Sequence, residues 1–324
     1  MIKSQVDGQF EYVDRNGLLF RIDLDRRRQI LTRLLELKKS EVGTPELLTR
    51  VKGFDDRQHS NFISLCIGIE QLTNSDKLWA NAKTVAETNP EVFEPKYVAT
   101  TFKPSSCVPT YQQCQICTQA CGIHILTKLL KPIHRMDLVT AIRWLSNCVL
   151  LHEKYNDDAR TVASNVGSIQ QRLSIDHIGY YRWQGLKADK IFSFWVRTMF
   201  DLGYWDVDLS DYDIPVDIHI ARFPFRTRMI ESLQKMELHI KHHRDIVCHF
   251  WKAGIGVPLD YDAIVWTISR NVCPRCNHSC ELYDVCGRNF AINLTYKTYG
   301  KIKLPKFEDV REEEVKQWRM KRKM

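Results

Sequence analysis

The chain has 324 residues, a formal net charge of +8 and 44% hydrophobic side chains. This length and apolar content are enough for one large domain or two smaller ones, which excludes a wholly disordered protein. The first residues contain no apolar signal stretch, and no window approaches eighteen uncharged apolar residues. We therefore expect a soluble, intracellular protein. We further expect it to be a monomer of the cytoplasm, nucleoid or nucleus.

The positive charge is concentrated near the C-terminus. Residues 287–324 contain eleven Lys or Arg and five Asp or Glu. Such a segment can neutralise the phosphates of a nucleic acid, giving affinity that depends on salt and not on sequence. A solvated surface is the other reading of the same charge.

The first predicted element is a β-hairpin over residues 9–24, where Asn16-Gly17 separates two apolar-rich runs. From Asp25 to Lys39 the hydrophobic period becomes helical. Further helices are predicted at residues 58–72, 76–88, 111–131, 136–153, 157–173, 187–201, 218–241, 243–253 and 260–269. The sequence therefore predicts a mainly α protein with a small N-terminal β-hairpin.

Four cysteines lie within fourteen residues near the end of this pattern. They are Cys273, Cys276, Cys280 and Cys286. Thiolates this close together can converge on one metal centre without long-range folding. Structural disulfides are the main alternative, but eleven cysteines in a reducing compartment, an odd number, fit disulfide pairing poorly.

Asp217 stands at the start of a predicted helix. A carboxylate in this position accepts hydrogen bonds from the backbone N–H groups of the first turn and is favoured by the helix dipole. Taken alone, this pattern is typical of an ordinary aspartate cap.

The residues around Asp217 follow a longer pattern, V-D-x-H-I-x-R with a later Arg-Thr pair. Its members are Val216, Asp217, His219, Ile220, Arg222, Arg226 and Thr227. This segment closely resembles the catalytic-aspartate segment of endonuclease III, a member of the helix-hairpin-helix DNA glycosylase superfamily. In the iron–sulfur branch of that superfamily a [4Fe–4S] loop follows the aspartate. The C-x5-C ending of the cysteine group here is similar to the end of that loop.

The spacing of the cysteines departs from the family pattern. Family loops usually run C-x6-C-x2-C-x5-C, whereas this chain runs C-x2-C-x3-C-x5-C. The resemblance implies a [4Fe–4S] cluster on Cys273, Cys276, Cys280 and Cys286, with zinc as the alternative. Arg275 and Arg288 are near enough in sequence to this loop to contact DNA phosphates.

The family also has a glycine-containing hairpin and, in its bifunctional members, a catalytic lysine before the aspartate. The best counterpart here is the segment from Gln184 to Ile191, in which Gly185 is the only glycine and Lys187 replaces the second. The resemblance implies that both contact DNA. Lys190 begins a helix much like the lysine of an archaeal 8-oxoguanine glycosylase branch, and it is the candidate nucleophile. A surface lysine on an amphipathic helix is the alternative.

The segment Glu70-Gln71-Leu72-Thr73 loosely resembles the family's motif for filling the gap left by a flipped base. Gln71 is therefore the candidate wedge, and an exposed helix-end glutamine is the alternative reading. Tyr180, Tyr181, Trp183 and Trp205 follow further along the chain. Such aromatics can offer stacking faces for bases but are more often part of a core.

The resemblance implies a base-excision repair enzyme that acts on double-stranded DNA containing a damaged or modified base. The base would be flipped out and its N-glycosidic bond cleaved, with Asp217 stabilising positive charge on the sugar. Attack by Lys190 would give a Schiff base and strand cleavage by β-elimination. A monofunctional glycosylase, in which Asp217 activates water, and a non-catalytic iron–sulfur DNA-binding protein are the alternatives.

The implied fold has two helical lobes. The predicted division is residues 1–24 for the hairpin extension, residues 25–54 with 211–300 for the iron–sulfur lobe, residues 55–210 for a helical barrel lobe with the hairpin, and residues 301–324 for the basic tail.

A second cysteine group precedes this region, comprising Cys107, Cys114, Cys117 and Cys121. The last three recur with the period of one helical stripe, which favours buried core thiols. A second metal centre is the other interpretation.

Overall fold

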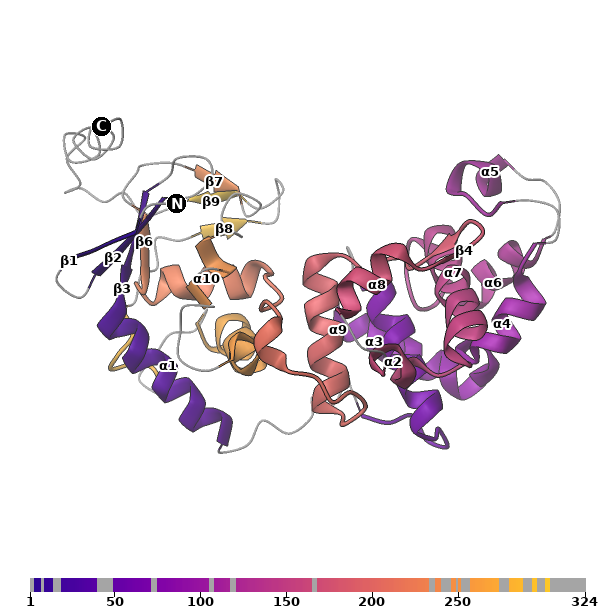
Figure 1. Cartoon of the computed structure of the whole chain (residues 1–324), viewed down its shortest axis with the longest axis horizontal. Helices are drawn as coiled ribbons and strands as arrows, with labels where there is room; N and C mark the ends of the chain where they lie inside the picture. Colours follow the sequence, from indigo (N-terminus) through magenta and orange to yellow (C-terminus); the bar gives the residue numbers. More distant parts are fainter. Residues whose placement is uncertain are drawn as a thin grey trace. The chain divides into compact units, whose positions relative to one another are not determined.

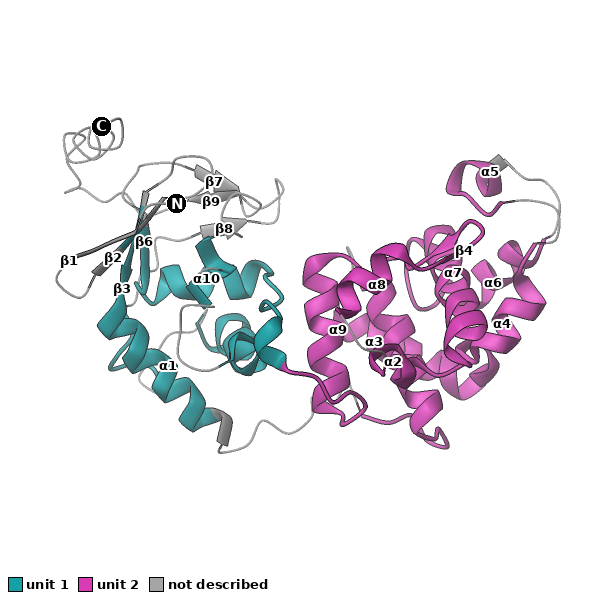
Figure 2. Cartoon of the chain, in the orientation of Figure 1, with its two compact units in different colours: residues 1–42, 209–324 teal, residues 43–208 magenta. Residues whose placement is uncertain are grey.

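The chain forms two compact units, residues 1–42 with 209–324, and residues 43–208 (Figure 2). The computed structural model describes residues 3–6, 9–13, 19–39, 49–70, 75–104, 108–116, 121–164, 168–232, 237–239, 246–248, 250–251, 257–273, 280–287, 293–295 and 301–303. Helices predominate in these ranges. The mainly α fold that the sequence predicts is thereby confirmed.

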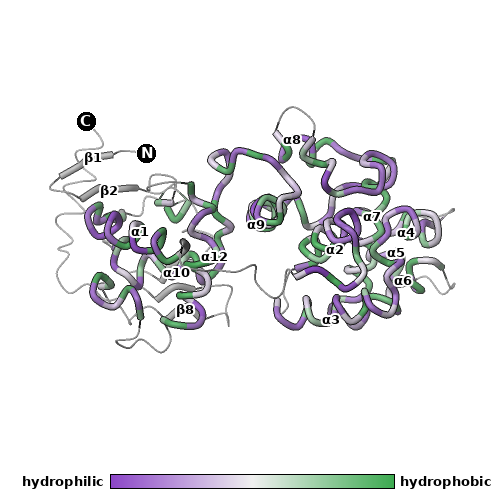
Figure 3. Tube along the Cα trace, turned by 90° about the horizontal axis from the view of Figure 1, so that it is seen from below, coloured by the Kyte–Doolittle hydropathy of each residue, from purple (hydrophilic) through white to green (hydrophobic). Residues whose placement is uncertain are grey.

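The unit of residues 43–208 is helical (Figure 1). Its α-helices are α2 Asp56–Ile69, α3 Ser75–Thr88, α4 Pro95–Phe102, α5 Tyr111–Ile116, α6 Gly122–Leu130, α7 Asp137–Tyr155, α8 Ile169–Ile175 and α9 Asp189–Asp201. The shorter elements are the 3₁₀ helices η2 Pro90–Phe93 and η3 Ala159–Ala163 and the strands β4 His177–Ile178 and β5 Tyr181–Arg182. Helix α7 packs against α2, α4 and α6. Hydrophobic and hydrophilic residues alternate along the helices of this unit (Figure 3).

The unit formed by the two ends of the chain combines helices with two small sheets. The helices are α1 Leu24–Lys39, η4 Leu209–Asp211, α10 Ile218–Arg226, η5 Pro258–Tyr261, α12 Asp262–Thr267 and the π-type helix η6 Ile268–Val272. The strands are β1 Lys3–Val6, β2 Gln9–Val13, β3 Leu19–Asp23, β6 Ile230–Ser232, β7 Glu237–His239, β8 Asn293–Thr295 and β9 Lys301–Lys303. The sheet orders are β1-β2-β3-β6 and β7-β9-β8, and neighbouring strands in both sheets are antiparallel.

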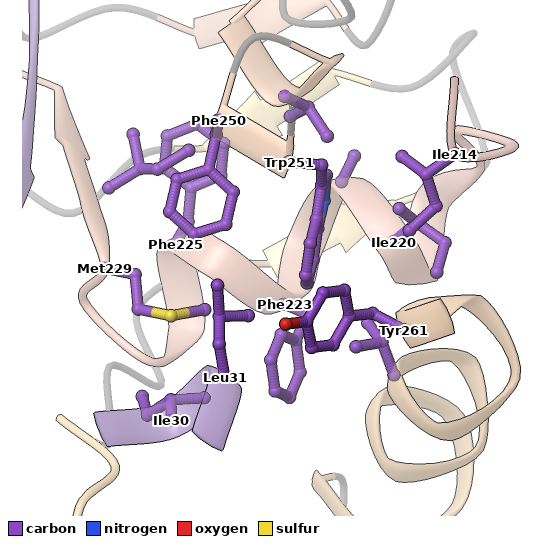
Figure 4. Packing of buried hydrophobic residues seen from close by; sticks show 14 of the residues in the cluster. Ile30, Leu31, Ile214, Ile220, Phe223, Phe225, Met229, Phe250, Trp251 and Tyr261 are labelled. Atoms are coloured by element: carbon purple, nitrogen blue, oxygen red, sulfur yellow. The ribbon is translucent and has the colours of Figure 1, made fainter. Parts of the chain in front are cut away.

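The core of this unit joins segments that are distant in sequence. Leu31 of α1 lies in one hydrophobic cluster with Phe223 of α10, together with Trp251 and Tyr261 (Figure 4). Each of these four side chains is fully buried. Burial of a large apolar side chain contributes about 1.5–3 kcal/mol, so this cluster fixes α10 against both ends of the chain.

The predicted hairpin is confirmed, and it is part of the same core. Strands β2 and β3 pair in antiparallel register, with Val13 opposite Leu19. Strand β3 also pairs with β6, and its Phe20 and Ile22 are fully buried. The Phe20 ring meets the Phe225 ring edge to face at a centroid distance of 6.3 Å.

The prediction of one helix over residues 218–241 is wrong. Helix α10 ends at Arg226, and the chain continues as strands β6 and β7. Pro224 lies within α10 and has no N–H to continue the ladder of hydrogen bonds. Arg228 then takes the left-handed conformation with φ of 58°, which turns the chain toward β3.

Two other long helices are also interrupted. Residues 111–131 form α5 and α6, and residues 157–173 form η3 and α8. At the start of α6, a β-carbon on Gly122 would lie 2.5 Å from the carbonyl oxygen of Phe102. This close approach of two main chains is a tertiary contact that the helical period does not reveal.

Gly185 lies against the main chain of α2. Its φ is 78°, and a β-carbon built there would lie 1.9 Å from the carbonyl oxygen of Gly68 in α2. We expect Gly185→Ala to lower the free energy of unfolding by at least about 3 kcal/mol, because left-handed backbone strain adds to a clash with backbone. Chemical denaturation measures this loss.

Gly203→Ala is the matched control. Gly203 has φ of 72°, but nothing lies within 4 Å of the added carbon. This variant should lose only about 1–2 kcal/mol from backbone conformation. Equal losses in the two variants would contradict the close contact at Gly185.

Candidate active site and cysteine loop

Asp217 caps the N-terminus of α10, as the sequence predicts. One carboxylate oxygen accepts hydrogen bonds from the backbone N–H groups of His219 and Ile220, at 2.8 and 2.9 Å. Asp217 itself is extended, with φ of −108°, and the helix begins at Ile218. The cap therefore directs the carboxylate along the first turn of the helix.

The other oxygen of Asp217 accepts a hydrogen bond from the indole N–H of Trp266, at 3.0 Å. Trp266 lies in α12, which packs against α10. The imidazole of His219 meets the indole edge to face at 5.8 Å, and the guanidinium carbon of Arg270 lies 4.5 Å from the indole centroid. Three N–H donors thus hold Asp217, and both of its oxygens act as acceptors, which suits a carboxylate.

Sequence reasoning missed Trp266. A half-buried tryptophan needs a partner for its indole N–H, but the residue type does not say which acceptor it finds. The partner follows only from the packing of α12 on α10.

His219 lies in the first turn of α10, beside Asp217, and is half-buried. Burial lowers the pKa of its imidazole, and the positive charges of Arg222, Arg270 and Arg226 lower it further. The carboxylate of Asp217 raises the pKa of His219, but the net shift is downward. Arg222, Arg226 and Arg270 therefore contribute positive charge around His219.

The far end of α10 is joined to the cysteine loop. The guanidinium of Arg226 donates to the carbonyl oxygen of Ser269 at 3.5 Å and hydrogen-bonds the thiol of Cys273. The backbone N–H of Gly287 donates to the carbonyl oxygen of Thr227 at 3.2 Å. One helix thus has the aspartate at its start and the cysteine loop at its end.

Three of the four clustered cysteines are described, and all three pack against the hydrophobic cluster of this unit. They are Cys273, Cys280 and Cys286. Burial raises the pKa of the Cys273 thiol to about 11, and its neighbours Cys286 and Cys280 raise it as well, whereas Arg226 lowers it. The three thiols are therefore close enough to interact electrostatically.

A short turn fixes the end of the loop. Leu282 is buried, and its carbonyl oxygen accepts the N–H of Cys286 at 2.8 Å, while the Cys280 carbonyl accepts the N–H of Tyr283 at 2.9 Å. Within the ranges that the structure describes, no three His, Cys, Asp or Glu side chains form a group that could hold a metal ion. Cys276, Arg275 and Arg288 lie outside those ranges. A metal centre on the four clustered cysteines therefore stays a prediction.

The predicted lysine and hairpin residues belong to the other unit, whereas Asp217 belongs to the unit formed by the chain ends. Lys190 is the second residue of α9, and its side chain is exposed. Lys187 is also exposed, in a turn that closes when the N–H of Ala188 donates to the Gly185 carbonyl at 3.1 Å. Gln71 lies outside the described residues.

The chain leading into Gly185 is anchored by two side chains of α7. Asn147 donates to the carbonyl oxygen of Gln184 at 3.0 Å and accepts its N–H at 2.8 Å. Ser146 makes the same pair of contacts with Arg182, accepting the backbone N–H at 3.0 Å and donating to the carbonyl oxygen at 2.5 Å. Each side chain thus completes main-chain hydrogen bonds that a neighbouring strand would otherwise make.

The aromatic residues of this segment differ sharply in exposure. Tyr181, Trp183 and Trp205 are buried, as expected for core residues, whereas Tyr180 is 75% exposed.

The second cysteine group does not form one helical stripe, so that prediction is wrong. Cys114 is buried in α5, whereas Cys121 caps α6 and its sulfur lies 3.4 Å from Nδ1 of His124. The break between α5 and α6 separates the two residues, and Cys107 and Cys117 lie outside the described ranges.

Across the part of the chain that the structure describes, every helix is too short or too polar to cross a membrane. Comparisons of the chain with protein-family models, with curated proteins and with solved structures give no match.

Proposed function

We propose that this protein is a DNA glycosylase of the helix-hairpin-helix type, which removes a damaged or modified base and cleaves the resulting abasic site by β-elimination. The observation that carries the proposal is the environment of Asp217. Its carboxylate caps α10, is oriented by Trp266, and shares that helix with residues bound to the cysteine loop. An ordinary cap needs only the backbone contacts, so the Trp266 contact supports a role beyond capping.

The chemistry begins with a base that leaves the stack, at a cost of a few kcal/mol. The fixed carboxylate of Asp217 would stabilise positive charge on the sugar as the glycosidic bond breaks. Because its hydrogen bonds are already formed, little reorganisation is required in the transition state.

Lys190 would supply the nucleophile. Its neutral amine attacks the anomeric carbon, and the base leaves with the bonding electrons and gains a proton. Opening of the sugar ring gives a Schiff base, from which β-elimination breaks the bond to the 3′ phosphate. Asp217 would accept and return the protons in these steps.

The cysteine loop would have a structural role. Cys273, Cys276, Cys280 and Cys286 would hold a [4Fe–4S] cluster, or zinc as the alternative, and so order the loop against Arg226 and Thr227. Such a centre supplies folding stability to the segment that binds it. The partner is double-stranded DNA inside the cell, bound by a monomer, with Lys187, Arg275 and Arg288 near its phosphates.

Lys190→Gln should abolish the covalent complex that borohydride traps between the protein and lesion-containing DNA, because glutamine cannot form a Schiff base. Duplexes with single oxidised pyrimidines, 8-oxoguanine or abasic sites provide the substrates. Denaturing gel electrophoresis then measures the trapped species and the cleaved strand.

Lys187→Gln is the matched control, since Lys187 is an exposed lysine of the same segment. It should retain the trap and bind duplex DNA more weakly, with a smaller dependence on salt. Base release without a trap in the unaltered protein would favour the monofunctional mechanism with Asp217-activated water. Duplex binding without base release from any lesion would favour the non-catalytic alternative.

A further inference from the structure

The hairpin formed by β4 and β5 presents an unusual apolar surface to solvent. Tyr180 at its tip is 75% exposed and Ile175 at its base is 68% exposed, the two highest values for large hydrophobic residues in the described ranges. Single exposed apolar side chains are common on protein surfaces. Here Ile175 ends α8 just before β4, Tyr180 lies in the turn between β4 and β5, and the next residue in the chain, Tyr181, is buried.

The turn itself accounts for the position of the ring. His177 pairs with Arg182 and Ile178 pairs with Tyr181, which leaves Gly179 and Tyr180 as a two-residue loop. Gly179 has φ of 57°, as the first position of a type II′ turn requires. The Tyr181 side chain is buried, and Nζ of Lys103 lies 5.5 Å from the centroid of the Tyr181 ring. Tyr180 is therefore the exposed residue at the tip of the hairpin.

The base of the hairpin is anchored to the helical core. Ser146 holds both main-chain groups of Arg182. On the other arm, the carboxylate of Asp176 accepts hydrogen bonds from Trp183 at 3.2 Å and from Lys154 at 2.8 Å, and from the hydroxyl of Tyr155. Because the hairpin is anchored where it joins the helical core, holding its tip against a partner costs less conformational entropy.

The surroundings of the hairpin carry positive charge. From residue 177 to residue 190 there are three Lys or Arg and one acidic residue, Asp189. Arg182, Lys187 and Lys190 are all exposed. An aromatic ring beside cationic side chains matches a nucleic acid, which offers base faces for stacking and phosphates for charge pairing.

We propose that the β4–β5 hairpin contacts the DNA duplex and that the ring of Tyr180 stacks on a nucleobase exposed when the damaged base leaves the helix. This inference rests on the proposed function and adds to it the element that fills or props open the gap. Arg182 pairs with a phosphate beside that gap, and Ile175 packs against the neighbouring sugar.

Tyr180→Ala tests the inference. The probe is a duplex that contains one abasic site opposite 2-aminopurine, a base whose fluorescence changes on stacking. Loss of one base–aromatic stack should weaken binding to this duplex about 10- to 100-fold. It should also remove most of the fluorescence change, whereas Tyr180→Phe should preserve both because the phenyl ring still stacks.

Two further variants separate stacking from other effects. Tyr111→Ala alters another exposed tyrosine of the same unit and should bind as the unaltered protein does. Arg182→Gln should reduce the salt dependence of binding, whereas Tyr180→Ala should leave it unchanged. Thermal unfolding of each variant shows whether the fold is retained.

The outcomes distinguish this inference from the proposed function. Base release by the unaltered protein, with Tyr180→Ala equal to it in binding and fluorescence, would overturn the hairpin assignment alone. Duplex binding that depends on Tyr180 without base release would support the hairpin and reject the glycosylase. Absence of nucleic-acid binding, with Tyr180 needed instead for association with another protein, would overturn both.

Discussion

Asp217→Asn is expected to lower the rate of base release by about 10²- to 10⁴-fold, the range typical of a lost acid–base group. The amide cannot stabilise positive charge on the sugar as a carboxylate does. Single-turnover kinetics on a lesion-containing duplex measure this loss directly, because they separate chemistry from product release.

The fold should survive this substitution, since asparagine is as good a helix cap as aspartate. The amide oxygen can still accept the N–H groups of His219 and Ile220. The amino group of the asparagine, however, would face the indole N–H of Trp266. Two hydrogen-bond donors would then face each other, because the oxygen that accepts the indole N–H in Asp217 is lost. A modest loss of stability, about 1–3 kcal/mol, should follow from the unsatisfied pair.

Two controls separate chemistry from structure. Trp266→Phe removes the indole donor but keeps the carboxylate, so it should reduce the rate far less than Asp217→Asn does. Asp55→Asn alters the aspartate that caps α2 through the N–H of Gln58 at 2.7 Å, and it should leave the rate unchanged. Base release by Asp217→Asn at the unaltered rate would reject Asp217 as the catalytic carboxylate.

If the proposed metal centre is present, Cys286→Ser is expected to release it and to destabilise the unit formed by the chain ends by several kcal/mol. Structural metal sites contribute their binding free energy to folding, with apparent values of about 10–16 kcal/mol for zinc in small domains. The loss should be smaller here, because the hydrophobic cluster remains. Iron, sulfide and zinc contents, visible absorbance and the unfolding temperature provide the measurements.

Cys121→Ser is the matched control, because it alters a half-buried thiol of the helical unit. It should leave the metal content unchanged if the second cysteine group binds no metal, and a loss of metal in this variant would indicate a second centre. Full metal content in Cys286→Ser would contradict the proposed ligand set. A colourless protein with stoichiometric zinc would replace the cluster by zinc and leave the glycosylase proposal standing.

The sequence predicts those elements whose cause is local. The helical period begins at Asp25 and the Asn16-Gly17 pair marks a turn, and the structure has α1 and the β2–β3 pair in these places. Asp217 was also identifiable as a cap, because its residue type and the apolar period after it both lie within a few positions.

The remainder depends on tertiary contacts. Pro224 was visible in the sequence, but the left-handed turn at Arg228 and the pairing of β6 with β3 arise from packing. The hydrogen bond between Trp266 and Asp217 joins two helices, and no regular spacing of residues in the sequence predicts it. The exposure of Tyr180 beside buried Tyr181 follows from anchoring by α7 and the turn at Gly179, which aromatic content alone does not predict.

The pairing of the two chain ends has a consequence for the order of folding. The Phe20 side chain emerges early during synthesis, yet its partners Phe225 and Ser232 follow only after the whole of residues 43–208. The helical unit of residues 43–208 can complete its own core before the first hairpin and α1 pack against residues 214–282. During that interval the edge of β3 and the apolar face of α1 are unprotected, which exposes this segment to misassociation on the ribosome.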